Sequence, residues 1–248
     1  MKPCITSFGI LLLVVLSVLN TTGQTHGTLK FTLIHTANGK PVELNTTTYN
    51  TPNGEEYTIK KLRYYFSNFK FPDNPTLEDA DNYQLIDQAR STSFSIPVLP
   101  GKYTHIEWLL GIDSLRHCSG AQEGALDPMN DMFWTWNTGY VVFKLDGTST
   151  SSTADRNRIE HHIGGFRFGQ NVSTLLSFEL PNDRPLEITA GKTTEITLHL
   201  NLDRYWKSKE TILIAREPVC TVPDALARKI ASNFPYLFEI EDIKVHEN

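Results

Sequence analysis

The chain has 248 residues and a formal net charge of −5, and 40% of its residues are hydrophobic against 21% charged. This composition contains no basic cluster and no long acidic run, so nucleic acid is not an expected partner. After the N-terminal segment, no apolar stretch is long enough to form a membrane-spanning helix.

The N-terminal segment has the layout of a secretory signal peptide. Lys2 provides a positive start, an apolar run follows from Ile10 to Leu19, and small or polar residues occupy Asn20 to Gly23. The run is too short to span a bilayer. We therefore predict that residues 1–24, including Cys4, are removed, and that residues 25–248 form a single periplasmic or secreted domain.

Two cysteines remain in the predicted mature chain, Cys118 and Cys220. In an oxidising compartment an even pair is compatible with a disulfide, which would close a long loop. Two free thiols, or Cys118 as a soft metal ligand, are the alternatives that the sequence leaves open.

Most of the chain alternates apolar and polar residues with a period of two, which predicts β-strands. The first strand places Leu29, Phe31, Leu33 and His35 on one face. Further runs follow in chain order: TIKKLRYYFSNFKF (58–71), SFSIPVL (93–99), HIEWLLGI (105–112), GYVVFKLDG (139–147), LLSFELP (175–181) and PLEITAGKTTEITLHLNLD (185–203).

One helix is predicted near the C-terminal end. Asp224 is a candidate N-cap, and Leu226, Ile230 and Phe234 follow at helical spacing before a break near Pro235. Together these elements predict an all-β fold, an antiparallel β-sandwich of the Ig-like or Greek-key type, with a small C-terminal helix.

Three histidines are candidates for metal binding. His35 lies at the end of the first predicted strand, where a structural, hydrogen-bonded histidine is the main alternative. His161 and His162 are adjacent on a strand, so at most one of them points inward. Gly164 and Gly165 follow directly and allow the backbone to approach closely, or to turn sharply, next to the imidazole. Two histidines alone leave a copper site incomplete, so a third donor is required.

Loop residues offer two weaker possibilities. His117 adjoins Cys118, and this pair could bind metal or form a nucleophile and base, although a structural loop histidine is the favoured interpretation. Asp113, Asp127 and Asp131 have oxygen donors that suit calcium, and ordinary turn formation is the alternative. No GxSxG, HExxH, P-loop or GxGxxG motif is present, so the sequence does not predict an enzyme.

Trp134 and Trp136 have the same strand parity and should face the same way, in the block GALDPMNDMFWTWNTGYVVFKLDG. Packing is the simplest interpretation of the two indoles. A position beside a metal site is the alternative.

The order of motifs resembles the MbnP-like copper-binding family. The resemblance rests on LIHTANGKPVELNTTTY, KLRYYFSNFKF, YQLID, PGKYTHIEWLLGIDS, the tryptophan block and HHIGGF, and it is strongest from Leu29 to Phe166. It implies a secreted or periplasmic β-sandwich that binds copper through histidines and a tryptophan oxidised to kynurenine. It also implies a partner of the di-haem peroxidase type, related to MauG, that performs this oxidation.

Carried over by motif, the implied copper ligands are His35, His162 and one of Trp134 or Trp136, with His161 as the alternative to His162. Some relatives have a histidine two residues after the modified tryptophan, where this chain has Thr138 after Trp136, or Trp136 after Trp134. The resemblance therefore implies a copper-handling protein. A metal-free interaction domain and a protein that serves mainly as the substrate of an oxidising haem enzyme are the other two hypotheses.

Overall fold

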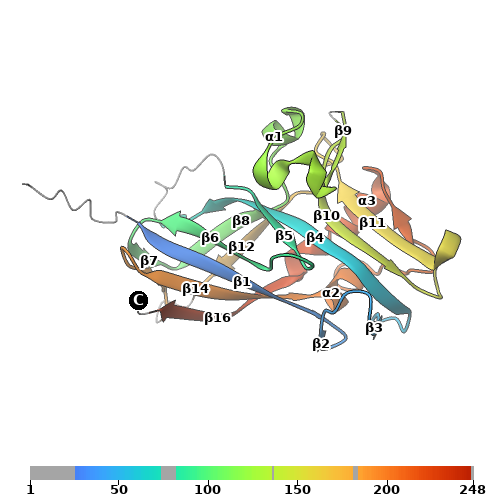
Figure 1. Cartoon of the computed structure of the whole chain (residues 1–248), viewed down its shortest axis with the longest axis horizontal. Helices are drawn as coiled ribbons and strands as arrows, with labels where there is room; N and C mark the ends of the chain where they lie inside the picture. Colours follow the sequence, from blue (N-terminus) through green and yellow to red (C-terminus); the bar gives the residue numbers. More distant parts are fainter. Residues whose placement is uncertain (1–25, 74–81, 136, 181–183, 247–248) are drawn as a thin grey trace, which may run out of the picture.

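Two mixed β-sheets pack face to face in the computed structural model, which describes residues 26–73, 82–135, 137–180 and 184–246. Figure 1 shows the smaller sheet below the larger one, with α1 and β9 projecting together at one edge. The predicted signal peptide and Trp136 lie outside the described residues. Within the described residues, no helix combines the length and the apolar character needed to span a bilayer.

The smaller sheet has the strand order β16-β14-β1-β2, with β6 also paired to β1. Its strands are β1 (Gly27–Ala37), β2 (Lys40–Pro41), β6 (Ser93–Val98), β14 (Thr193–Asn201) and β16 (Phe238–His246). Strand β1 forms because its inward residues alternate with polar ones, and Leu29, Phe31 and Leu33 are all buried as predicted.

The larger sheet has the strand order β12-β8-β4-β10-β11-β15, with β3 and β5 also paired to β4 and β9 to β10. Its strands are β3 (Thr48–Asn50), β4 (Glu56–Lys70), β5 (Gln84–Asp87), β8 (His105–Leu110), β9 (Phe133–Thr135), β10 (Gly139–Thr148), β11 (Arg158–Gly164), β12 (Thr174–Glu179) and β15 (Val219–Cys220). A separate pair joins β7 (Gly101–Tyr103) to β13 (Leu186–Ile188).

The prediction of an all-β sandwich is confirmed, but the sheets are mixed and not purely antiparallel. Strand β1 pairs with β14 in parallel, with Leu33 opposite Leu198, and β11 pairs with β15 in parallel. Parallel and antiparallel strands of a sandwich show the same period-two alternation, so the sequence pattern does not distinguish them.

The helices are short: α1 (Ser114–Cys118), α2 (Leu202–Trp206) and α3 (Ala225–Ala231), with 3₁₀ turns η1 (Gly124–Leu126), η2 (Pro128–Asn130), η3 (Asp155–Asn157) and η4 (Phe234–Tyr236). The predicted C-terminal helix is confirmed as α3. The Asp224 side chain caps it by accepting a hydrogen bond from the Ala227 N–H at 3.0 Å, and Pro235 lies in the turn that follows.

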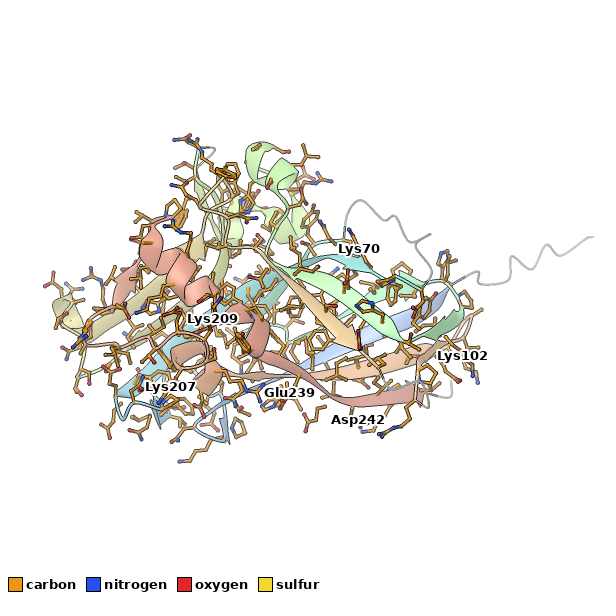
Figure 2. All side chains as sticks on the ribbon, turned by 180° about the vertical axis from the view of Figure 1, so that it is seen from behind. Lys70, Lys102, Lys207, Lys209, Glu239 and Asp242 are labelled. Carbon is orange, nitrogen blue, oxygen red and sulfur yellow. The ribbon has the colours of Figure 1, made fainter. Side chains whose placement is uncertain are left out.

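The main core fills the space between the sheets and is rich in aromatic side chains, among them the fully buried Trp108 and Trp206. Charged side chains lie outside it. Figure 2 labels Lys70 of β4, Lys102 of β7, Lys207 and Lys209 directly after α2, and Glu239 and Asp242 of β16. Charges of both signs are therefore dispersed over this face.

A second, smaller core lies on the outer face of the larger sheet, the face turned away from the smaller sheet. It is covered by residues 113–135, which contain α1, η1, η2 and β9 and are called the cap segment below. Tyr65, Met132, Tyr140 and Val141 are buried there. The cap segment explains why β4 and β10 are buried on both faces over part of their length.

Candidate functional site on the outer face of the larger sheet

The tryptophan block begins in the cap segment and continues into β10. Strand β9 pairs with the start of β10, and the ring of Phe133 packs on that of Tyr140 with 4.8 Å between centroids. The half-buried indole of Trp134 lies directly over Gly164 of β11, because a Cβ atom at Gly164 would be 2.8 Å from Trp134 Cζ3. A glycine is thus required where this indole meets the strand.

His161 and His162 point to opposite faces of β11, as their strand parity predicted. The burial pattern of β11 places Ile159, His161 and Ile163 in the core. His162 and Gly164 are two residues apart and share the outer face. The Trp134 indole lies over Gly164, so it and the side chain of His162 are neighbours along that face.

His162 is paired with a carboxylate. Its Nε2 lies 2.8 Å from Asp146 Oδ1, and the exposed fractions of the two side chains are 16% and 20%. A neutral imidazole that donates Nε2–H to this carboxylate carries its lone pair on Nδ1. No other described group forms a hydrogen bond with that nitrogen.

A group of basic side chains flanks this pair on the same face. Asp131, which directly follows η2, forms ion pairs with Lys61 at 2.8 Å and Lys144 at 3.1 Å, and with Arg63 at 3.8 Å. Partial burial raises the pKa of Asp131, but the two lysines outweigh it and bring the pKa down to about 2. These ion pairs fix the end of the cap segment to the sheet.

His35 does not join this group, because it points into the space between the sheets. It is 4% exposed, and both ring nitrogens are hydrogen-bonded, Nδ1 to Gln88 Oε1 and Nε2 to the Tyr64 hydroxyl at 2.7 Å. Burial lowers the pKa of His35 to about 4. Metal binding at His35 stays a prediction, and it would require one of these hydrogen bonds to break.

His161 is also fully buried and fully bonded. Its Nδ1 lies 2.8 Å from the Tyr205 hydroxyl and its Nε2 lies 2.7 Å from the Glu217 backbone oxygen. Burial lowers its pKa to about 4. The side chain is therefore a core histidine in this conformation, and the outward His162 is the better placed of the two for an external ligand.

His117, which the sequence favoured as a structural histidine, is the fully buried residue of α1. Its Nδ1 accepts the backbone N–H of Tyr140 at 3.1 Å, and its ring stacks on Phe166 at 5.0 Å. Gly139 makes room for it, since a Cβ there would lie 2.5 Å from Nδ1. The histidine thus ties α1 to the start of β10. Its neighbour Cys118 is exposed and free.

The other loop candidates form caps and turns. Asp113 caps α1 by accepting the Arg116 N–H, and Asp127 caps η2 by accepting the Met129 N–H at 2.8 Å. Among the residues that the structure describes, no three His, Cys, Asp or Glu side chains form a cluster that could hold a metal ion. The structure therefore does not bring the carboxylates of Asp113, Asp127 and Asp131 together as calcium ligands. Cys220 is buried and not bonded to Cys118.

Comparison with known proteins places the chain in a family. The sequence profile of the MbnP family matches residues 26–222, and this range contains β1 to β15 with the outer-face site. Among solved structures, MbnP from Methylosinus trichosporium superposes with a TM-score of 0.53 at 12% identity, over 82% of this chain and 87% of that one. A comparison with curated protein sequences gives no match. The chain belongs to the MbnP family.

Proposed function

We propose that this protein is a copper-binding protein, active in copper acquisition or handling, with copper as its cargo. The observation that carries the proposal is the pair formed by His162 and Asp146 beside Trp134, on the outer face of the larger sheet. Metal-binding histidines typically donate their second ring N–H to a carboxylate, which fixes the tautomer and raises the basicity of the ligand nitrogen. His162 has this arrangement.

The donor chemistry of the family site fits this chain in part. As a neutral imidazole that donates Nε2–H to Asp146, His162 would offer copper the lone pair of Nδ1, whereas the nitrogens of His35 and His161 are all engaged in the core. An imidazole suits either copper oxidation state, and further donors complete the site. We propose that these come from the tryptophan block, at Trp134 or Trp136.

An unmodified indole offers copper no good lone pair. Oxidation to kynurenine would supply an aromatic amine and a carbonyl, and we propose a di-haem enzyme of the MauG-related type as the oxidising partner. Trp134 is half-buried on the outer face of β11, which leaves part of the indole accessible to such a partner. We propose the periplasm or the extracellular space as the location, and binding without catalytic turnover as the activity.

Competition for Cu(I) against a chromophoric chelator tests the site in purified protein. The variants are His162→Ala, which removes the ligand, and Asp146→Asn, which keeps the side-chain shape but weakens the support for the imidazole. Loss of such a supporting group typically reduces metal affinity by about 10–100-fold. His105→Ala is the matched control, because His105 is a partly exposed strand histidine paired with Glu107 on a different part of the sheet.

We expect His162→Ala to abolish the high-affinity copper site, Asp146→Asn to weaken it and His105→Ala to leave it unchanged. Equal affinities for all four proteins would contradict the proposed site. The titration is made on protein before and after exposure to the oxidising haem enzyme, with peptide mass measured on the tryptophan block. A mass change on a tryptophan without any gain in copper affinity would favour the hypothesis that the chain is mainly a haem-enzyme substrate.

One observation favours a metal-free interaction domain as the second candidate. The described residues contain no cluster of three metal-ligating side chains. On that hypothesis the protein shows no high-affinity copper site with or without tryptophan oxidation, and His162→Ala changes only its stability.

A further inference from the structure

Two tyrosine–histidine pairs lie in the main core between the sheets. The Tyr64 hydroxyl is 2.7 Å from His35 Nε2, and the Tyr205 hydroxyl is 2.8 Å from His161 Nδ1. Tyr64, Tyr205 and His161 are 0% exposed and His35 is 4% exposed. These four side chains are thus held in pairs away from water.

The direction of each hydrogen bond follows from the second partner of the histidine. Gln88 Nε2 donates to the Val42 backbone oxygen, so Gln88 Oε1 is the acceptor that faces His35 Nδ1. The proton of His35 is therefore on Nδ1, and its Nε2 accepts the hydroxyl proton of Tyr64.

The second pair has the same polarity. His161 Nε2 faces the Glu217 backbone oxygen, which can only accept, so this nitrogen carries the proton. His161 Nδ1 therefore accepts the hydroxyl proton of Tyr205. In both pairs a buried phenol donates to the free nitrogen of a neutral imidazole.

One aromatic ring joins the two pairs. Phe143 stacks on Tyr64 with 5.6 Å between centroids and an interplanar angle of 12°, and on Tyr205 with 5.3 Å and 17°. Near-parallel rings at these separations are in offset-stacked contact. The core thus contains a continuous stack from one hydrogen-bonded phenol to the other.

We infer that Tyr64–His35 and Tyr205–His161 form a buried redox site that holds a tyrosyl radical and exchanges the electron hole across Phe143. In the oxidation step the phenol loses one electron to a one-electron oxidant. Its O–H bond breaks, and the proton moves to the lone pair of the histidine nitrogen. The products are a neutral tyrosyl radical, an imidazolium and the reduced oxidant, and the return of one electron reverses each change.

The protonation of the resting tyrosines agrees with this assignment. Burial raises the pKa of both tyrosines well above its ordinary value, so the proton stays on the phenol until an electron leaves. An oxidised phenol is a strong acid, and the histidine nitrogen that already accepts its hydrogen bond takes the proton without any rearrangement. High-valent haem iron is one class of oxidant with sufficient driving force.

The rings also continue from Tyr205 toward another part of the core. Trp206 lies 5.1 Å from Tyr205, and Tyr57 lies 5.2 Å from Trp206, measured between centroids. Oxidisable side chains thus follow one another at contact distance beyond the two pairs. This gives a hole a path of short steps in place of one long step.

Flash oxidation of metal-free protein by a diffusing Ru(III) polypyridyl complex tests the inference, with radicals followed by optical absorbance and by EPR after freeze-quenching. Exposed tyrosyl radicals are accessible to coupling and reduction, whereas a buried radical persists. We expect a long-lived neutral tyrosyl radical whose formation is slower in D₂O. Tyr64→Phe and Tyr205→Phe should each lower its amplitude, and the double variant should abolish it.

Tyr103→Phe is the matched control, because Tyr103 is 1% exposed but donates its hydroxyl proton to the Leu99 backbone oxygen, which is not a base. It should keep the full signal. The same long-lived radical in the Tyr64/Tyr205 double variant, or formation at equal rates in H₂O and D₂O, would overturn the inference. The isotope measurement uses the unsubstituted protein, so it does not depend on folding of the variants. Because no copper is present, the result is independent of the proposed copper site.

Discussion

Acidification should destabilise this protein in a pH range set by three buried neutral histidines. Burial lowers the pKa values of His35, His117 and His161 from 6.5 to about 4. The same side chains have ordinary pKa values in the unfolded chain. Below pH 6.5 the unfolded chain therefore binds more protons than the folded protein, and the free energy of unfolding falls with pH until the folded pKa is reached.

Each histidine with these two pKa values contributes a loss of about 2 kcal/mol between about pH 7 and about pH 5. The three together contribute about 6 kcal/mol, which is comparable to the whole stability of many domains. Asp131 and Glu195 also have lowered pKa values, but both are at about 2, so these carboxylates lose their contribution mainly at lower pH.

Urea unfolding at about pH 7 and at about pH 5 measures this loss of unfolding free energy, and His161→Gln isolates the contribution of one histidine. Glutamine keeps a donor for the Glu217 oxygen and an acceptor for the Tyr205 hydroxyl, but it does not titrate. We expect the variant to lose about 2 kcal/mol less than the unsubstituted protein between the two conditions. Equal losses, or a stability that does not change with pH, would refute the reasoning.

Three further substitutions test the packing at Gly164, the ion pair of Asp131 and the helix N-cap of α3. Gly164→Ala should cost about 1–3 kcal/mol and change the fluorescence of Trp134, because the new Cβ would be 2.7 Å from the Tyr140 backbone oxygen and 2.8 Å from the indole; unchanged urea unfolding and emission would contradict these contacts. Asp131→Asn should cost about 1 kcal/mol at low salt and less at high salt, since Lys144 loses its carboxylate partner; a cost independent of salt would exclude that cause. Asp224→Ala should cost about 1 kcal/mol in thermal unfolding by removing the α3 cap, and an unchanged midpoint would refute it.

Strand periodicity predicted the parts of the site that depend on local structure. The alternation in β11 separates His161 from His162 whatever the surrounding fold, and the structure has them on opposite faces. The glycine at 164 indicated a close approach to an imidazole, whereas the ring that lies over it is the indole of Trp134. These features follow from the geometry of a single strand.

Tertiary contacts determined what periodicity could not predict. The strand pattern placed His35 on the inward face, but not its two hydrogen-bond partners, because Gln88 and Tyr64 come from other strands or loops. The parallel pairing of β1 with β14 likewise depends on how distant segments meet. The burial of His117 depends on the five-residue helix α1, which has no periodic signal of its own.

The role of His161 shows the same limit. The sequence left His161 as the alternative to His162 for copper, whereas the structure gives it a core partner, Tyr205, from 44 positions further along the chain. A histidine pair in a sequence thus has two separate environments when it lies on a strand. The outward member is the one to which the proposed copper function is assigned.

Copper content, measured by ICP-MS on protein isolated from the periplasm of copper-fed cells, tests the central claim most directly. The comparison is between the unsubstituted chain, the outward variant His162→Ala and the inward variant His161→Gln. The proposed site predicts about one copper per chain in the first and third proteins and background copper in His162→Ala. Equal copper in all three proteins, or none in any of them, would contradict a copper site on the outer face of β11.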